Sequence, residues 1–246
     1  MIWSLPQCRT PELMDNPDIA EQDHVEALDA LATINAVSRT AAQIAAAVHW
    51  MSPSPAPPLV VIDVACGGGD VTCDLARRLC QITPTMGSPA RVIGLDRSGR
   101  AIDRARRVAA ARGIDASFEV RDVLADGLPE CDVAVSSLFL HHLDDDGARR
   151  LMRAMAAAAR RGIVVSDLVR SRIGLALAVV GTTLLSRSRV ARIDGPLSVR
   201  AARTPDECRE LCRSAGLHGA VVTRVWPERL MIRWRKDALR CGEGAA

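Results

Sequence analysis

Three aspartates follow apolar segments of the chain: Asp63 ends LVVID, Asp96 ends RVIGLD and Asp122 follows FEVR. Gly67–Gly69 come four to six residues after the first aspartate. A glycine turn between a strand and a helix brings bare backbone N–H groups against a ligand. Carboxylates at neighbouring strand ends can bind ribose hydroxyls and an adenine amino group, because parallel strands open on one crevice. The set therefore predicts a nucleoside-like cofactor, although each aspartate alone could cap a helix and the glycines could form only a tight turn.

A second group of polar residues could move a proton. His141 and His142 follow the apolar segment 131–137, and Asp167 ends the segment 162–167. Imidazole ionises near neutral pH, so either histidine could act as the base for an acceptor hydroxyl or orient it. Asp167 could orient a histidine or the acceptor, or only cap the next helix. The residues leave open which histidine faces the site and whether the other packs beneath the loop.

An alternation of strands and helices must position these residues. Short apolar runs predict strands at 59–64, 91–96, 116–121, 131–137 and 162–167. Capping residues and amphipathic spacing predict helices between them at 69–82, 98–112 and 144–160. Apolar runs between helices indicate a parallel sheet that is covered on both faces.

The chain after residue 168 breaks this alternation. We expect an apolar helix, a basic loop, a capped helix and a closing hairpin, at 173–185, 187–203, 204–216, and 219–226 with 229–235. The first two would form a helical substrate insert at 168–203, whose apolar residues suit a small hydrophobic acceptor. Arg170 and Arg200 could bind an acidic or quinone oxygen, but single arginines mean little in so arginine-rich a chain.

Residues 1–50 are expected to form a helical cap that serves as a substrate lid. Residues 10–12, Thr-Pro-Glu, resemble a helix start, and apolar residues over 25–48 recur as in one amphipathic helix or two. The segment 51–58 contains four prolines and predicts a stiff linker. The main domain would then cover 51–246.

Four segments resemble the class I S-adenosylmethionine-dependent methyltransferases. DVACGGGD (63–70) is similar to that family's first motif and RVIGLD (91–96) to its ribose-binding motif. RDVLADGLP (121–129) is similar to its adenine-contacting segment, and CDVAVSSLFLHHL (131–143) to its fourth motif. The resemblance implies a Rossmann-like α/β fold with a seven-stranded, mostly parallel sheet, helices on both faces and an antiparallel C-terminal hairpin. It also implies S-adenosyl-L-methionine (SAM) as cofactor and S-adenosyl-L-homocysteine (SAH) as product.

The resemblance also implies a set of site residues. The cofactor contacts fall on the ends of the first four strands, at Asp63, Ala65, Cys66, Gly67, Gly69, Asp96, Arg97, Asp122, Val123 and Ser137. Ala65 departs from the family, which has a glycine there, and its methyl group would crowd the cofactor slightly. The catalytic candidates are His142, His141 and Asp167, with no metal ion.

Other classes of protein fit the sequence less well. A nicotinamide enzyme would need G-x-G-x-x-G, and a short-chain dehydrogenase a tyrosine; the chain has neither. A net charge of +3 and 2% aromatic residues argue against nucleic-acid binding. Zinc is disfavoured because no CxxC occurs, and Asp144–Asp146 look like a helix start rather than metal ligands. We expect a cytoplasmic protein, because no signal peptide is visible, the eight cysteines suit a reducing compartment and 173–185 is too short to span a bilayer.

The expected function is methyl transfer from SAM to a small hydrophobic acceptor, most simply a hydroxyl oxygen. The C-terminal segments look like those of bacterial methyltransferases of secondary metabolism that act on phenolic, polyketide-derived or quinone-type molecules. Two alternatives stay open: a methyltransferase of RNA or protein, and a non-catalytic SAM-binding protein. The apolar cap helix could equally pack against a second copy of the chain in a homodimer.

Overall fold

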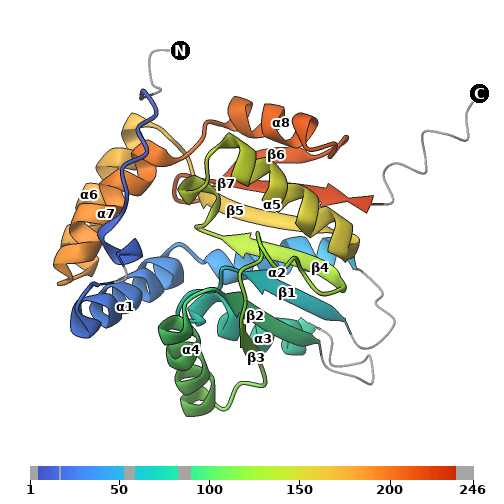
Figure 1. The fold of residues 1–246 in the computed structure, drawn as a ribbon, viewed down its shortest axis with the longest axis horizontal. Helices are drawn as coiled ribbons and strands as arrows, with labels where there is room; N and C mark the ends of the chain where they lie inside the picture. The colour runs from blue at the N-terminus through green and yellow to red at the C-terminus, as the bar shows by residue number, and fades with distance from the viewer. Residues whose placement is uncertain (1–4, 17, 53–58, 83–89, 237–246) are drawn as a thin grey trace, which may run out of the picture.

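The computed structural model describes residues 5–16, 18–52, 59–82 and 90–236, so most of the expected proline linker lies outside the described residues. Seven strands form one sheet in the order β3-β2-β1-β4-β5-β7-β6 (Figure 1). Their bounds are Val60–Val64 (β1), Arg91–Asp96 (β2), Ser117–Val120 (β3), Cys131–Ser137 (β4), Ala159–Leu168 (β5), Val221–Val225 (β6) and Arg229–Arg235 (β7). β1 to β5 pair in parallel, and β7 runs antiparallel to β5 and β6. The predicted fold class is confirmed.

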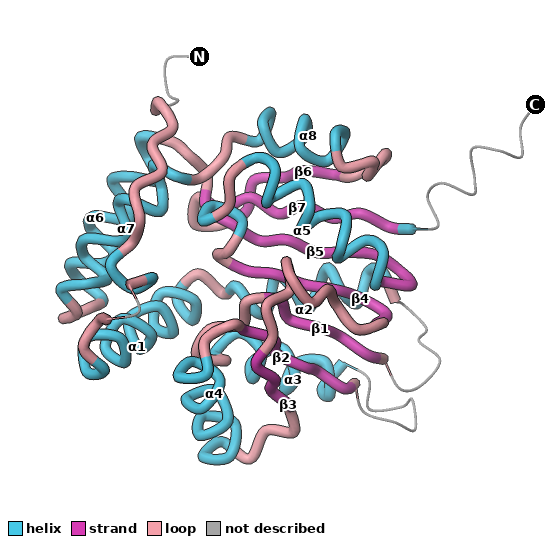
Figure 2. The backbone as a smooth tube through the Cα atoms, in the orientation of Figure 1, coloured by secondary structure: helices cyan, strands magenta, loops and turns pink. Residues whose placement is uncertain are grey.

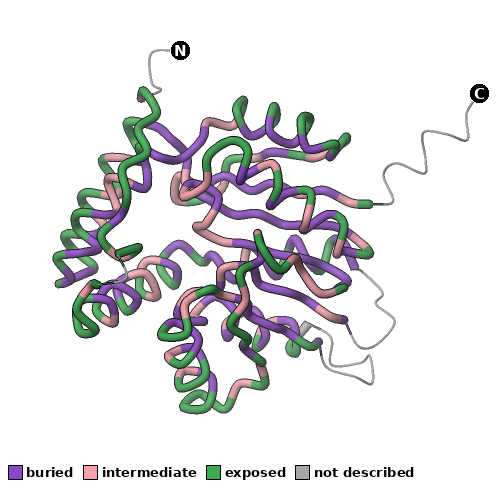
Figure 3. The backbone as a smooth tube through the Cα atoms, viewed as in Figure 1, coloured by how far each residue is buried: buried purple, intermediate pink, exposed green. Residues whose placement is uncertain are grey.

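The sheet explains why the sequence pattern of its strands is continuous rather than alternating. β4 and most of β1 and β5 are buried on both faces (Figure 3), so apolar residues occupy successive positions. The strand order reverses between β1 and β4, which pair with each other. In an open α/β sheet, such a switch point opens a crevice at the carboxyl ends of the strands.

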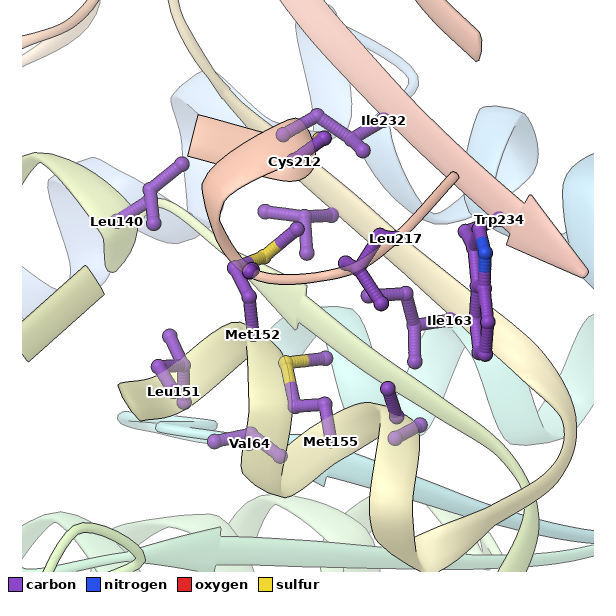
Figure 4. Packing of buried hydrophobic residues seen from close by; sticks show 14 of the residues in the cluster. Val64, Leu140, Leu151, Met152, Met155, Ile163, Cys212, Leu217, Ile232 and Trp234 are labelled. Carbon is purple, nitrogen blue, oxygen red and sulfur yellow. The ribbon is translucent and has the colours of Figure 1, made fainter. Parts of the chain in front are cut away.

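Helices cover both faces of the sheet. On one face lie α2 (Thr40–Met51), α3 (Asp70–Ile82) and α4 (Gly99–Arg112), and on the other α5 (Asp145–Ala158) and α8 (Pro205–Ser214). Figure 4 shows Met152 and Met155 of α5 packed with Ile163 of β5 and with Leu217, which follows α8. The predicted caps are confirmed at two helices: Asp144 Oδ1 accepts the Gly147 N–H at 2.7 Å, and α8 begins with the predicted capping box.

Three further helices gather at the carboxyl edge of the sheet. α1 (Glu21–Val37), α6 (Arg172–Leu185) and α7 (Arg189–Ala201) contact one another and lie together at the left of Figure 2, and α1 also contacts α2 and α3. α2 does not belong to this group, because Ile44, Val48 and Met51 pack in the core against the sheet. The residues expected to form one cap, 1–50, are therefore divided between the group of α1, α6 and α7 and the core of the sheet.

The prediction of a basic loop over 187–203 is wrong, because residues 189–201 form α7. Gly195 and Pro196, which look like helix breakers, lie inside this helix. A Cβ added at Gly195 would lie 2.7 Å from Thr182 Cγ2 of α6, so the glycine lets the two helices approach. Packing against α6 and α1 therefore stabilises α7 despite its local sequence.

The predicted helix start at residues 10–12 is also wrong. Within 5–16 the only helical turn is a 3₁₀ turn, η1 (Leu13–Asp15). This segment, called here the N-terminal strap, lies along α7: the Cys8 N–H donates to the Arg200 carbonyl at 3.1 Å. The N–H groups of Leu13 and Met14 donate to the Asp194 carboxylate at 2.8 and 3.0 Å. These contacts replace the hydrogen bonds that a helix would supply.

Within the described residues, no helix combines the length and the apolar character that a membrane span requires.

Candidate functional site

Two cavities meet at the carboxyl edge of the sheet. The larger, about 730 Å³, is lined by the glycine turn after β1, the ends of β2, β3 and β4, and α1. We call it the glycine-turn cavity. The smaller, about 300 Å³, is lined mainly by α1, α6, α7 and the strap, and we call it the lid cavity. Met14, Leu31, Leu138 and His142 line both cavities, so one set of side chains borders the two spaces.

The glycine-turn cavity collects most of the predicted cofactor residues. Eight of them line it: Ala65, Cys66, Gly67, Asp96, Arg97, Asp122, Val123 and Ser137. Asp96 is fixed beside the turn, because its carboxylate accepts the Gly67 N–H at 2.9 Å and the Ser98 N–H at 2.8 Å. Asp122 is exposed and accepts the Leu124 N–H at 3.0 Å, so it also caps a turn.

Asp63 lies buried behind this cavity. Thr72 donates its hydroxyl hydrogen to Asp63 Oδ2 at 2.6 Å, while Asp63 Oδ1 has no hydrogen-bond partner among the described residues. Burial raises the pKa of Asp63 to about 7, and the charges of Asp70 and Asp96 add to this rise. Burial also raises the pKa of Asp70, which lines the cavity and accepts a hydrogen bond from Asn35 at 2.9 Å. A positively charged ligand in this cavity would favour the ionised form of these acids.

The glycines of the turn serve different purposes. Gly67 has φ +52 and lines the cavity. Gly69 does not line it; a Cβ there would lie 2.6 Å from the Ala105 Cβ, so the packing of α4 already accounts for this glycine. Ala65 holds a left-handed conformation with φ 57, which favours glycine. Leu138, at the border of the two cavities, is strained in the same way with φ 53.

His141 is enclosed at the end of the lid cavity. Its Nδ1 lies 2.7 Å from Asp167 Oδ1, and its backbone N–H donates to Asp167 Oδ2 at 3.0 Å. Burial lowers the pKa of His141, but the charge and hydrogen bond of Asp167, together with Glu12, raise it to about 10. Burial raises the pKa of Asp167, but His141 outweighs it and the net shift is downward. Asp167 is therefore placed to orient His141, one of the three roles that the sequence left open.

The strap brings two further acids to the histidines. His141 Nε2 lies 3.5 Å from Glu12 Oε1, and His142 Nε2 lies 4.0 Å from Glu12 Oε2. His142 Nδ1 lies 3.0 Å from Asp15 Oδ2. Glu12 is buried and also accepts a short hydrogen bond from Ser198 of α7. Glu12, His141 and His142 all face the lid cavity.

Sequence reasoning missed Glu12, Asp15, Asn35 and Asp70. Asp70 adjoins the glycine run, and its place at the start of α3 could have revealed it. Glu12 and Asp15 meet the histidines only through the tertiary path of the strap, and the residues before Glu12 resemble a helix cap. The suggestion that Arg170 binds the acceptor is not supported, because its guanidinium donates to Glu207 and to the Leu5 and Ala202 carbonyls.

Comparisons with known proteins agree with this geometry. Residues 61–162 match the family described as a methyltransferase domain. No curated protein sequence matches the chain at a significant level.

Solved structures share the fold. An O-methyltransferase family 2 protein from Planctomyces limnophilus DSM 3776, in complex with apigenin, is 19% identical with a TM-score of 0.61, over 89% of this chain and 63% of that one. Magnesium protoporphyrin IX methyltransferase from Synechocystis PCC 6803, with bound SAM, is 16% identical with a TM-score of 0.52, over 91% and 88%. Human N-acetylserotonin methyltransferase, in complex with SAM, is 18% identical with a TM-score of 0.52, over 72% and 47%.

Proposed function

We propose that the chain is a class I SAM-dependent methyltransferase that methylates a hydroxyl oxygen of a small hydrophobic acceptor. The match of residues 61–162 to a methyltransferase domain and the fold shared with solved, SAM-bound methyltransferases support this proposal. The acceptor class is a phenol, a polyketide-derived phenol or a quinol. The observation that carries this proposal is the lid cavity, a mainly apolar space in which His142 also lines the glycine-turn cavity. Apolar cavities with a few convergent polar groups suit small aromatic ligands.

The glycine-turn cavity would hold the cofactor. Asp96 is placed to accept hydrogen bonds from the ribose hydroxyls, and Asp122 and Val123 stand where the resemblance places adenine. Asp70, which lines this cavity, would bind the ammonium group of SAM, whose positive charge would favour the ionised carboxylate. When bound, SAM supplies an electrophilic methyl group on a sulfonium centre.

The chain's contribution at the acceptor is to orient the hydroxyl and exclude water. His141 has both ring nitrogens directed at carboxylates and is 4% exposed, so neither nitrogen is directed at an acceptor. The side chain of His142 is 21% exposed and lines both cavities, which makes it the better candidate for the group that orients the hydroxyl or takes its proton. Asp167 and His141 then act as positioning residues.

Two measurements test this function. Calorimetry should show binding of SAM and SAH, and Asp96→Ala should weaken both at least tenfold, about 1.4 kcal/mol, through lost ribose contacts. Mass spectrometry should detect O-methylated product from a panel of small phenols such as 1-naphthol, and His142→Ala should lower turnover while leaving SAM affinity nearly unchanged.

Two experimental results would contradict this function. Failure to bind either SAM or SAH at high micromolar concentration would exclude methyl transfer from SAM. Methylation of RNA with strong salt dependence, and none of the phenols, would favour a macromolecular substrate instead.

A further inference from the structure

We propose that Glu12, His141 and His142 form a binding site for a divalent transition-metal ion of the Zn²⁺ type, at the border of the two cavities. The three side chains offer two imidazole nitrogens and a carboxylate, and one atom from each lies within 4.8 Å of the others. Two histidines and one glutamate are a donor set that Zn²⁺ takes in catalytic sites, which keep a further position open.

The spacing of these atoms fits ligands of a shared ion better than hydrogen bonds. The two contacts of Glu12 with Nε2 atoms measure 3.5 and 4.0 Å. Nitrogen–oxygen hydrogen bonds in proteins are shorter, about 2.7–3.2 Å. Ligand atoms bound about 2.0–2.2 Å from one Zn²⁺ at ordinary coordination angles lie about 3.0–3.5 Å apart. A small adjustment of His142 would therefore complete the set.

The outer contacts of both histidines prepare their Nε2 atoms for a metal ion. His141 Nδ1 lies 2.7 Å from Asp167 and His142 Nδ1 lies 3.0 Å from Asp15. A carboxylate that accepts the Nδ1 proton fixes the tautomer in which the Nε2 lone pair is free, as in most metal-binding histidines. The same arrangement occurs twice here, and both Nε2 atoms lie within 4.0 Å of the Glu12 carboxylate, so a metal ion that binds them would displace any Nε2 proton.

The carboxylates around His141 and His142 give the proposed site a negative charge that favours binding of a cation. Glu12, Asp15 and Asp167 carry three negative charges. With both imidazoles neutral, as metal binding requires, the positive charge of Arg97, which lowers the pKa of Asp15, leaves two of them uncompensated. The excess extends to Asp194, whose pKa is raised by burial and then by the charges of Glu12 and Asp15. A divalent ion would compensate this excess where the cluster meets the lid cavity.

The position of the site gives the ion a role, and this step rests on the proposed function. All three ligands line the lid cavity, so the open coordination position would face the acceptor. A bound divalent ion lowers the pKa of a coordinated hydroxyl. The histidines would then hold the ion rather than take the proton themselves.

Cobalt is a suitable probe, because Co²⁺ substitutes for Zn²⁺ and its visible absorption reports its ligands. The chelator-treated full chain, titrated with CoCl₂, should bind one equivalent with visible bands that lack a thiolate charge-transfer component, and ZnCl₂ should displace the Co²⁺. Glu12→Gln and His142→Ala should abolish binding, and Asp15→Asn should weaken it about 10–100-fold. His218→Ala, which removes an exposed imidazole, is the matched control and should bind normally.

Three results would overturn the site: no stoichiometric Co²⁺ binding, binding unchanged in both Glu12→Gln and His142→Ala, or a thiolate spectrum that disappears on replacing the exposed Cys8 and Cys80 by serine. SAM calorimetry on the same variants shows that they are folded. It also tests the proposed function separately, because SAM affinity depends on residues of the other cavity. Methylation of 1-naphthol that survives chelation would leave the proposed function standing and remove the role of the ion.

Discussion

Ala65 has a left-handed backbone conformation in the turn that lines the glycine-turn cavity. In the folded chain this conformation costs an alanine roughly 1–2 kcal/mol and costs a glycine almost nothing. A glycine, however, has more conformational freedom in the unfolded chain, which lowers stability by about 0.4–1 kcal/mol. We therefore expect Ala65→Gly to raise the free energy of unfolding by about 0.5–1 kcal/mol in urea denaturation.

A matched substitution tests whether the gain is specific to this conformation. Ala46 is exposed within α2, where Ala→Gly should instead lower stability by about 1 kcal/mol. If the two variants lose stability alike, Ala65 carries no conformational strain.

The buried carboxyl of Asp63 should make stability depend on pH. Its pKa is about 7 in the folded chain against an ordinary value of 3.8, so between these values the folded state binds more protons than the unfolded state. Stability is then lost as pH rises from about 4 to about 7, by up to about 4 kcal/mol. Asp63→Asn has no such proton, and its stability relative to the wild type should rise over this interval.

Urea denaturation of both proteins at pH 4 and pH 7 measures this difference. Asp206→Asn, at a carboxylate that is 92% exposed, provides the control and should follow the wild-type pH dependence. Parallel curves for Asp63→Asn and the wild type would show that the folded state holds Asp63 at its ordinary pKa.

At the scale of elements, α6 forms one wall of the lid cavity, and the space beside Gly181 in this wall is empty. Gly181 lines the cavity, and a Cβ there would meet nothing within 4 Å. Replacing a glycine inside a helix gains about 1 kcal/mol of helix propensity. Gly181→Leu should therefore keep or raise stability and leave SAM affinity unchanged, while raising the KM for 1-naphthol at least tenfold by filling the cavity.

Steady-state kinetics and calorimetry separate these effects. Val179→Leu adds bulk to the exposed side of α6 and should leave KM unchanged. An unaltered KM in Gly181→Leu would mean that the acceptor binds elsewhere.

The elements of the sheet were predictable because each carries its own signal. β2 and β4 have the predicted bounds, since apolar runs between capped helices have few alternative structures. α7 was not predictable in this way. Gly195 and Pro196 oppose a helix locally, and the close approach of Thr182 on α6 explains the glycine. The sequence around α7 does not encode its contact with α6, and this tertiary contact is what the prediction lacked.

At the scale of the whole molecule, the strap joins the first residues of the chain to α7 and to the histidines. Asp194 holds it through the N–H groups of Leu13 and Met14. Asp194→Ala would leave both part-buried donors without this partner, and a hydrogen bond to a charged group contributes about 1.5–3 kcal/mol to stability. We expect faster hydrogen exchange at residues 13–15, measured by mass spectrometry, while the core strands keep their protection.

Asp206→Ala, on the exposed side of α8, is the control for this experiment and should leave strap exchange unchanged. Strap exchange equally slow in Asp194→Ala would show that other contacts, such as that between Cys8 and Arg200, suffice.

The candidate site was predictable only where topology determines it. Asp63, Asp96 and Asp122 end or follow parallel strands of one sheet, so their convergence follows from the fold class. Glu12 reaches His141 across almost 130 residues of sequence, through a strap with no regular structure until η1. No periodicity or motif encodes such a contact.

The thin border between the two cavities has a consequence for the products. Leu138 and His142 face both spaces, so only an atom at the inner end of the lid cavity can approach the reacting group. An acceptor with several inequivalent hydroxyls would present one of them at that depth and keep the others among α1, α6 and α7. We therefore expect a single methylated regioisomer, in which the depth of the cavity determines which hydroxyl carries the methyl group.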